Sequence, residues 1–368
     1  MTVDEQFMQI ALDLAATAEG RTRPNPAVGA LVIKDGLVVG EGYHPAAGQP
    51  HAEIFALRQA GSKAFGATLY VTLEPCSHSG RTGPCADAVV AAGIARVVVA
   101  TSDPNPLVSG RGLERLRQAG IVVETGVLES QARRLIAPFA KHVTTGLPLV
   151  VLKAGMTLDG MTATASGDSQ WITNPASRTL VHQLRDKVDG ILVGVGTVLA
   201  DNPLLTTRLP QGGRNPLRVV VDSQLRIQEE AALLETAPDC QTLIVTTAAA
   251  APEKRRRLTE RGVQILEVDS QGNKVNLLQM LKDLGGMGIQ SLLLEGGATL
   301  NHAMLHASLV DRVMFFLAPK LIGGQGRGVF AGPGVARLGE AFALDELRAR
   351  MIEGDILIEG EVRPCSPA

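Results

Sequence analysis

Short apolar segments with strand character alternate with helical segments along almost the whole chain. Examples are Thr68–Leu73, Arg96–Ala100 and Leu217–Val221, which are rich in Val, Leu and Ala and are each followed by a polar or helical stretch. Strands separated by a helix favour parallel pairing, because a parallel neighbour is reached only through a long crossover connection. The alternation therefore predicts an α/β fold, with parallel or mixed sheets covered by helices.

A chain of 368 residues is long enough for about two such domains, at roughly 100–200 residues each. The segment 137–148 contains two prolines and a glycine and is a candidate junction. We expect domains at residues 1–145 and 146–368. The first should open with a helix and a hairpin formed by Ala27–Ile33 and Leu37–Tyr43. Aromatic residues make up only 3% of the chain, so both cores must be aliphatic.

Charge and hydropathy exclude several classes of protein. The net charge of −2 gives no general attraction to nucleic acid, and the basic run Lys254–Arg257 is typical of a solvated helix face. The most apolar run, Ile191–Ala200, is far shorter than the roughly 20 residues of a membrane span. The N-terminus lacks the pattern of a signal peptide. We expect a cytoplasmic protein without a nucleic-acid or membrane partner, in which neighbouring cysteines indicate metal binding or catalysis.

One group of residues in the first domain has the composition of a catalytic zinc site. His51 opens an expected helix, Cys76 follows the strand Thr68–Leu73, and Cys85 begins another helix. An imidazole and two thiolates are suitable zinc ligands and leave the fourth tetrahedral position open for water. Glu53, two residues after His51, could accept a proton from that water and pass it to a leaving amine.

Each element also has a simpler interpretation. Cys76 and Cys85 could be buried core residues or a disulfide, and His78 could complete a closed structural zinc site. Taken together and in this order, however, the residues match the His-x-Glu and Pro-Cys signature of zinc deaminases. The eight residues between Cys76 and Cys85 are more than the two of the general signature. This longer loop could place His78 and Arg81 over the site.

Three segments together resemble the bifunctional riboflavin-biosynthesis deaminase/reductase family. They are 24–29 (Pro-Asn-Pro-Ala-Val-Gly), 51–53 (His-Ala-Glu) and 74–85 (Glu-Pro-Cys-Ser-His-Ser-Gly-Arg-Thr-Gly-Pro-Cys). The resemblance implies a cytidine-deaminase-like three-layer domain that removes an amino group from a pyrimidinone carrying a ribosyl phosphate. It implies that His51, Cys76 and Cys85 bind zinc, that Glu53 shuttles protons, and that the substrate is contacted by Asn25, His44 and His78.

The second domain has glycine patterns at the ends of expected strands. Gly194-Val195-Gly196 resembles the start of a dinucleotide-binding fingerprint, although Leu199 replaces its third glycine, and a simple tight turn would also explain it. Glu295-Gly296-Gly297 could let backbone N–H groups approach a phosphate. Ser223 and Arg226 could accept the additional phosphate of NADP. Three cations could bind a substrate phosphate or be solvated: Lys153, Arg185 and Arg208.

The resemblance to the same family continues through this domain, in segments 153–160, 166–173, 197–203 and 295–297. It implies a dihydrofolate-reductase-like fold in which NADPH reduces the opened ribose to a ribityl chain. The residues implied to contact NADPH are Gly155, Trp171, Thr197, Asp201, Ser223 and Gly297. Those implied to contact the substrate are Ser169, Arg185, Leu205, Arg208 and Glu295, and Lys153 and Glu295 are our candidates for orienting the opened sugar.

Two alternatives stay open at this point. The chain could be a zinc deaminase of free or nucleic-acid bases, or its second domain could be a non-catalytic oligomerisation module. The favoured function is two-step: zinc-dependent deamination of 2,5-diamino-6-(5-phosphoribosylamino)pyrimidin-4(3H)-one, followed by NADPH-dependent reduction. By resemblance we also expect a homo-oligomer, a dimer or a higher form.

Overall fold

The computed structural model describes residues 1–77, 83–106, 108–235 and 240–363. Its contacts divide the chain into two compact units, residues 1–146 and residues 147–368. Each unit has its own sheet and its own aliphatic cores, so the α/β fold expected from the alternating pattern is confirmed. No helix among the described residues is long and apolar enough to cross a membrane.

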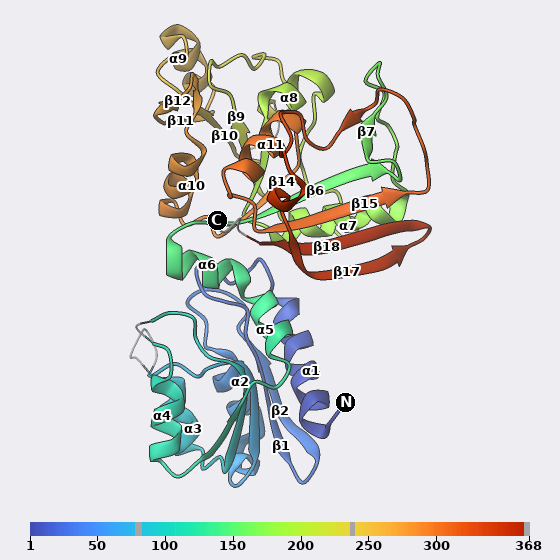
Figure 1. Cartoon of the computed structure of the whole chain (residues 1–368). Coiled ribbons are helices and arrows are strands. Elements are labelled where there is room, and N and C mark those ends of the chain that lie inside the picture. Colours follow the sequence, from blue (N-terminus) through green and yellow to red (C-terminus); the bar gives the residue numbers. More distant parts are fainter. Residues whose placement is uncertain (78–82, 107, 236–239, 364–368) are drawn as a thin grey trace. The chain divides into compact units, whose positions relative to one another are not determined.

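The first unit is built on a five-stranded sheet in the order β2-β1-β3-β4-β5 (Figure 1). β1 pairs antiparallel with β2 and β3, and the remaining pairs are parallel. The elements are α1 (Val3–Thr17), β1 (Gly29–Lys34), β2 (Leu37–Tyr43), α2 (Ala52–Ala60), β3 (Thr68–Leu73), α3 (Cys85–Ala91), β4 (Arg96–Thr101), α4 (Arg111–Gln118), β5 (Val122–Thr125), α5 (Glu129–Leu135) and α6 (Ala137–Thr145), with a short 3₁₀ turn at Gly61–Ala64.

Alternate residues of these strands face two different helical layers. Along β4, Val97 and Val99 pack with α2, α3 and α4, whereas Val98 and Ala100 pack with α1 and α5. Successive strand residues point to opposite faces, so a strand buried on both sides reads as a continuous apolar run. The result is the three-layer arrangement of a cytidine-deaminase-like domain.

Glycines in β2 bring α2 unusually close to the sheet. A Cβ on Gly40 would lie 2.1 Å from the carbonyl oxygen of Ala56, and one on Gly42 would lie 2.6 Å from that of Ala52. Neither distance leaves room for a side chain. This contact fixes the helix whose first turn follows His51.

The segment 137–148 predicts a junction, yet most of it is helical. α6 has Pro138 in its first turn, where a missing N–H group costs nothing, and it ends at Gly146 with a φ of +73°. The same two residues that suggest a break are thus a favourable helix start and stop. α5 lies immediately before α6 in the chain, and its start has neither a proline in the first turn nor a side-chain cap.

The second unit contains a nine-stranded sheet in the order β11-β10-β9-β8-β14-β6-β15-β18-β17. Its pairs are parallel from β11 to β15 and antiparallel at β15–β18 and β18–β17. The elements are β6 (Leu149–Thr157), β7 (Met161–Ala163), α7 (Pro175–Lys187), β8 (Gly190–Gly194), α8 (Val195–Asp201), β9 (Leu217–Val221), β10 (Thr242–Thr246), α9 (Pro252–Glu260), β11 (Gln264–Glu267), β12 (Ser270–Gln271), β13 (Lys274–Val275), α10 (Leu277–Gly286), β14 (Ser291–Leu294), α11 (Ala298–His306), β15 (Arg312–Ala318), β16 (Arg327–Gly328), β17 (Leu344–Ile352) and β18 (Asp355–Val362), with 3₁₀ turns at Ala232–Leu234 and Leu338–Glu340.

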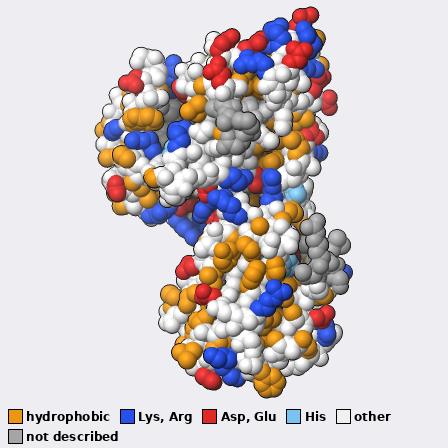
Figure 2. Space-filling model, turned by 180° about the vertical axis from the view of Figure 1, so that it is seen from behind, with side chains coloured by type: hydrophobic (Ala, Val, Ile, Leu, Met, Phe, Trp, Pro, Cys, Tyr) orange, Lys and Arg blue, Asp and Glu red, His pale blue; other side chains and the backbone are white. Residues whose placement is uncertain are grey.

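Two apolar clusters cover the faces of this sheet. In β8, Leu192 packs with α10 and α11 on one face, whereas Ile191 and Val193 pack with α8 and α9 on the other. In the basic run on α9, Arg256 and Arg257 are exposed, whereas Lys254 and Arg255 are half-buried and bonded to Ile227 and Glu267. Arg256 pairs with Glu260 and Arg257 with Glu229, and Figure 2 shows acidic and basic side chains mixed at this end of the unit.

Candidate active sites

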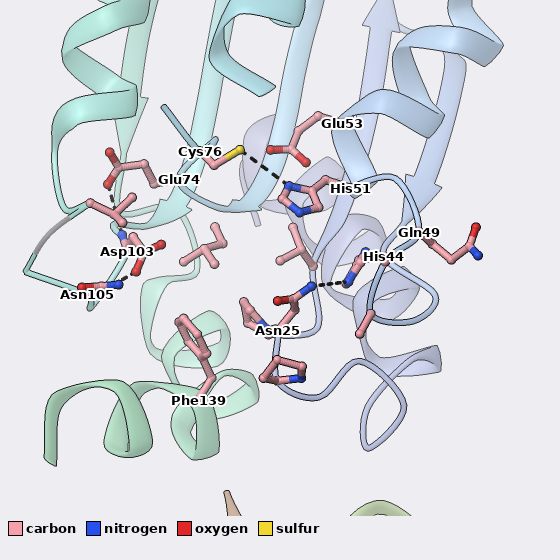
Figure 3. A pocket seen from close by; sticks show the side chains of 17 residues that line it. Asn25, His44, Gln49, His51, Glu53, Glu74, Cys76, Asp103, Asn105 and Phe139 are labelled. Atoms are coloured by element: carbon pink, nitrogen blue, oxygen red, sulfur yellow. Dashed lines mark hydrogen bonds between the residues drawn. The ribbon is translucent and has the colours of Figure 1, made fainter. Parts of the chain in front are cut away.

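Three elements of the first unit bring the expected zinc ligands together. His51 is the residue before α2, Cys76 follows β3, and Cys85 is the first residue of α3. The Nδ1 atom of His51 lies 3.7 Å from Sγ of Cys76 (Figure 3) and 3.3 Å from Sγ of Cys85. All three ligand atoms lie within 4.8 Å of one another.

This donor set fits a catalytic zinc ion. The backbone N–H of Cys85 donates to Sγ of Cys76 at 3.3 Å. The adjacent Cys85 thiol, the His51 ring and this N–H together outweigh burial and lower the pKa of Cys76, which favours its thiolate form. Cys76 and burial raise the pKa of Cys85, so only one of the two thiols ionises readily without a cation. One imidazole and two sulfur ligands leave one tetrahedral position open.

Glu53 lies against this group of ligands. Its side chain is almost fully buried, and Figure 3 shows the carboxylate beside the ring of His51 and the sulfur of Cys76. Burial raises the pKa of Glu53 to about 7, against the opposing effect of the His51 ring. A carboxyl group in this setting can both accept and release a proton near neutral pH.

A cavity of about 470 Å³ opens onto these residues. Asn25 and His44 form part of one side, and the Nδ2 atom of Asn25 donates to Nε2 of His44 at 3.0 Å. The other ring nitrogen, Nδ1, donates to the carbonyl oxygen of Pro50 at 3.1 Å, so the ring is neutral with its proton on Nδ1. Burial lowers the pKa of His44 in agreement with that state. The amide oxygen of Asn25 is left on the side away from His44 (Figure 3).

The cavity contains functional groups that the sequence motifs did not identify. Glu74, Asp103 and Asn105 line it, together with Gln49 and Phe139. Asp103 and Asn105 could have been found, because they follow β4 at the carboxyl edge of the parallel strands, where ligands bind in open α/β sheets. His78 and Arg81, which the sequence places over the site, lie outside the described residues.

In the second unit, Glu295 holds two of the expected cations together. Arg185 forms two hydrogen bonds with its carboxylate, of 2.7 and 3.0 Å, and Nζ of Lys153 lies 3.2 Å from Oε2. The Glu295 side chain is only 5% exposed. Burial alone would raise the pKa of Glu295, but Arg185 and Lys153 lower it to about 2. The Glu295 carboxylate therefore stays ionised throughout the physiological range.

A loop beside this cluster carries the other expected substrate contacts. Arg185 also donates to the carbonyl oxygen of Thr206 at 3.0 Å, and the backbone N–H of Arg208 donates to Nδ1 of His182 at 3.2 Å. Leu205 is buried with a φ of +54°, and the Arg208 side chain is exposed. The loop is thus anchored to α7 at two places. Ser169 lies apart from these bonds, in the segment after β7.

The glycine patterns line a second cavity of about 760 Å³. Gly194, Gly196 and Gly297 contribute to it, together with Ser223 and Arg226. Oγ of Ser223 accepts a hydrogen bond from the backbone N–H of Val275 at 3.0 Å, so this hydroxyl fastens the β12–β13 hairpin to the cavity. Its own hydrogen remains able to point to a ligand.

Lys274 is a second cation at this cavity that the sequence analysis did not single out. Neither Lys274 nor Arg226 forms an ion pair within the described part of the chain, and no acidic side chain is among the cavity's described lining residues. Asp222, which follows β9, is fully buried and accepts from the backbone N–H of Ile227 at 2.8 Å. The cavity is therefore suited to an anionic ligand.

The remaining expected coenzyme residues are not among the cavity's described lining residues. Thr197 Oγ1 would lie 3.2 Å from a Cβ on Gly297, so these two residues are neighbours. Gly155 faces Thr173, and Asp201 ends α8. Trp171 is 61% exposed, with the Arg178 guanidinium 4.7 Å from its ring centre.

Comparison with known proteins defines the class of each unit. Residues 1–101 match the cytidine and deoxycytidylate deaminase zinc-binding region, and residues 148–358 match the RibD C-terminal domain. A three-layer zinc deaminase followed by a dihydrofolate-reductase-like unit defines a bifunctional deaminase and reductase. The oligomerisation alternative for the second unit is accordingly disfavoured.

Whole-chain relatives give the family. The riboflavin biosynthesis protein RibD of Aquifex aeolicus is 44% identical over 357 residues, which cover 97% of this chain and 98% of the relative. The chain belongs to the RibD family of riboflavin-biosynthesis enzymes.

Solved structures agree with this assignment. The Acinetobacter baumannii RibD structure (39% identity, TM-score 0.85) covers 98% of this chain and 99% of its own. The Thermotoga maritima structure, titled diaminohydroxyphosphoribosylaminopyrimidine deaminase/5-amino-6-(5-phosphoribosylamino)uracil reductase, has 37% identity, a TM-score of 0.84 and the same coverage. The cofactors of the two activities are zinc and NADPH.

Proposed function

We propose that the two units catalyse consecutive reactions on one phosphorylated pyrimidine. Residues 1–145 would deaminate 2,5-diamino-6-(5-phosphoribosylamino)pyrimidin-4(3H)-one. Residues 146–368 would then reduce its ribosyl side chain to ribityl phosphate with NADPH. The observation that carries the proposal is the cluster of His51, Cys76 and Cys85, in a chain of this family. Of these residues, His51 and Cys76 line one cavity together with buried Glu53.

In the deaminase, the protein holds the metal and moves protons. His51, Cys76 and Cys85 would bind zinc, which when present makes a bound water acidic enough to react near neutral pH. Glu53 would accept a proton from the attacking water and deliver protons to the ring and to the departing amine. Overall, the C–N bond to the exocyclic amine is replaced by C=O, water is consumed and ammonia is released.

Asn25 and His44 would bind the substrate from the opposite side of the cavity. The hydrogen bond between them fixes the amide so that its oxygen faces away from His44, where it can accept from a sugar hydroxyl or a ring N–H. His78 is proposed as a third contact on the basis of family resemblance alone. Together these residues place the amine-bearing ring carbon near Glu53.

In the reductase, the ionised Glu295 cluster would orient the opened sugar. Lys153 is our candidate for polarising it, because its ammonium forms one hydrogen bond with Glu295, whereas Arg185 forms two and a third with Thr206. Arg208, with an exposed guanidinium, suits the substrate phosphate. Ser169, Arg185 and Leu205 are further proposed contacts. When bound, NADPH would supply the hydride for the first carbon of the sugar, and one proton would complete the reduction.

The coenzyme would occupy the second cavity. Ser223 and Arg226 would bind the 2′-phosphate. Because Gly297 has no side chain, the backbone there could approach the pyrophosphate. Gly155, Trp171, Thr197 and Asp201 are proposed to contact the remainder of NADPH. Cations and the lack of acidic lining residues support a phosphate ligand here.

Two reciprocal variants test the assignment. Glu53→Gln should keep zinc and lose ammonia release, while still oxidising NADPH when the deaminated substrate is supplied. Glu295→Gln should keep ammonia release and lose NADPH oxidation. Ammonia release that persists in Glu53→Gln would exclude the proton role of Glu53, and NADPH oxidation that persists in Glu295→Gln would exclude the orienting role of Glu295.

The chain is also proposed to form a homo-oligomer in the cytoplasm. β17 is an edge strand whose residues are almost all exposed, including Leu347 at 62% and Met351 at 65%. The outer edge of such a strand has unpaired backbone N–H and C=O groups that can pair with another chain. A reducing compartment would keep Cys76 and Cys85 available to zinc. Light scattering of wild type and Leu347→Glu tests this interface, because a monomeric wild type would contradict it.

A further inference from the structure

Glu74 is a buried acid in the first unit that neither binds zinc nor moves a proton in the proposed reaction. Glu74 lies directly after β3, two residues before Cys76, and only 4% of its surface is exposed. Its backbone N–H donates to the carbonyl oxygen of Thr101 at 3.0 Å, which continues the β3–β4 pairing to this point. A buried carboxylate is costly unless its oxygens are fully hydrogen-bonded.

The carboxylate of Glu74 accepts four hydrogen bonds, all from the main chain. Oε2 accepts from the N–H groups of Asp103 at 3.1 Å and Gly110 at 3.0 Å. Oε1 accepts from those of Gly112 at 2.9 Å and Leu113 at 3.3 Å. Gly112 and Leu113 belong to the first turn of α4, whose preceding residue offers no side-chain cap. Glu74 therefore supplies the cap that the helix lacks.

The start of α4 lies in direct contact with the chain next to Cys76. A Cβ on Gly112 would lie 1.9 Å from the carbonyl oxygen of Pro75 and 3.2 Å from Oε1 of Glu74. No larger residue fits there without a shift of the backbone. The position of α4 relative to Pro75 is consequently set by Glu74 together with this glycine.

The two bonds on Oε2 hold both ends of one wall of the deaminase cavity. Asp103 is at one end and Gly110 at the other, and Asn105 and Val108 are the described residues between them that line the cavity. Oδ1 of Asp103 accepts from the backbone N–H of Asn105 at 2.8 Å. Figure 3 shows Asp103 and Asn105 across the cavity from His44. Moving this wall would change the distance between the two sides that enclose a substrate.

We propose that Glu74 is a positioning residue for substrate binding in the deaminase. Its carboxylate binds the backbone N–H groups of Asp103 and Gly110, at the two ends of this wall. These bonds hold the Asp103 and Asn105 side chains in position for the substrate. Carboxylate and amide groups at this place suit the amino groups and ring N–H of an aminopyrimidinone. The inference rests on the proposed deaminase function, and it assigns Glu74 an effect on KM through this wall.

The test is Glu74→Gln in the full-length, zinc-loaded protein. The amide keeps the shape of the side chain but directs N–H groups at two of the four N–H donors, so two bonds are lost. We expect the deaminase KM to rise about ten- to hundredfold. The value of kcat should stay within about threefold, and the zinc content should match that of the wild type. The matched control Glu114→Gln removes an exposed acid of the same helix α4 and should leave both constants unchanged.

A double-mutant cycle separates positioning from a general structural role. If Glu74 acts through the wall, the effect of Glu74→Gln on KM should largely disappear in an Asn105→Ala background. Full additivity, an unchanged KM in Glu74→Gln, or loss of kcat and zinc without a change in KM would each overturn the proposal.

Two further measurements keep the test decisive. Asp103→Ala and Asn105→Ala do not depend on the folding of a Glu74 variant, and an unchanged KM in both would also overturn the proposal. Wild-type protein without deaminase activity would instead contradict the proposed function, so the two failures are distinguishable.

Discussion

Replacement of Glu295 by glutamine gives a quantitative test of the electrostatics of the second unit. The pKa of Glu295 is lowered to about 2 from an ordinary value of 4.5. Each pKa unit corresponds to about 1.4 kcal/mol, so the ionised carboxylate stabilises the folded state by about 3 kcal/mol at neutral pH. Because the folded-state pKa is the lower one, this contribution is present above the unfolded value and declines as the pH falls towards 2.

The expected result is a pH-dependent difference between wild type and Glu295→Gln. At pH 7 the variant should be less stable by about 3 kcal/mol, and by pH 3.5 the difference should shrink by about 1 kcal/mol. Urea unfolding at each pH measures this. Trp171 is the only tryptophan in the chain, so its fluorescence reports on the second unit. The exposed ion-pair variant Glu260→Gln should change stability by less than about 1 kcal/mol at any pH. A constant difference across this pH range would refute the assignment of the low pKa to Glu295.

Three further predictions concern zinc, the coenzyme and the packing of the first unit. Removing zinc with a chelator should abolish ammonia release but leave NADPH oxidation with the deaminated substrate unchanged, and parallel loss of both activities would argue against separate sites. Lys274→Ala should raise the KM for NADPH about five- to tenfold with no change for NADH, because only the former carries a 2′-phosphate; an equal effect on both coenzymes would exclude a phosphate contact. Gly40→Ala should destabilise the first unit by about 1–3 kcal/mol, since its Cβ would lie 2.1 Å from the carbonyl oxygen of Ala56. Calorimetry measures the unfolding temperature, and an unchanged value would show that α2 can move away from the sheet without cost.

The sequence predicted the parts of the molecule that depend on local patterns. The strand Thr68–Leu73 and the helix Ala52–Ala60 appear with the expected bounds, because a buried apolar run and helical spacing are written within one segment. The ligands His51, Cys76 and Cys85 were found because their motif has a fixed order. Their convergence in the structure comes from the β3–β4 pairing and the packing of α2, which no local pattern describes.

Features with weak local signals were missed for physical reasons. β17 reads Leu-Asp-Glu-Leu-Arg-Ala-Arg-Met-Ile and lies exposed at the sheet edge, so it lacks the apolar run of a buried strand. From the sequence, Glu74 is recognisable only as a neighbour of the expected zinc ligand Cys76. The four backbone N–H groups that bind its carboxylate belong to residues 29 to 39 positions later in the chain, so no local pattern reveals them. Lys274 lies on a hairpin of two-residue strands, which are too short to produce a pattern.

The place of β6 in the second sheet has a consequence for the order in which the protein can fold during synthesis. β6 is the first strand of its unit to leave the ribosome, yet its two neighbours, β14 and β15, begin at residues 291 and 312. Its apolar residues 149–152 can therefore pair with a neighbouring strand only after more than 130 further residues have been synthesised. Contacts so distant in sequence slow folding and leave strands open to aggregation in the meantime. The five strands of the first unit, by contrast, are complete by residue 125, well before that point.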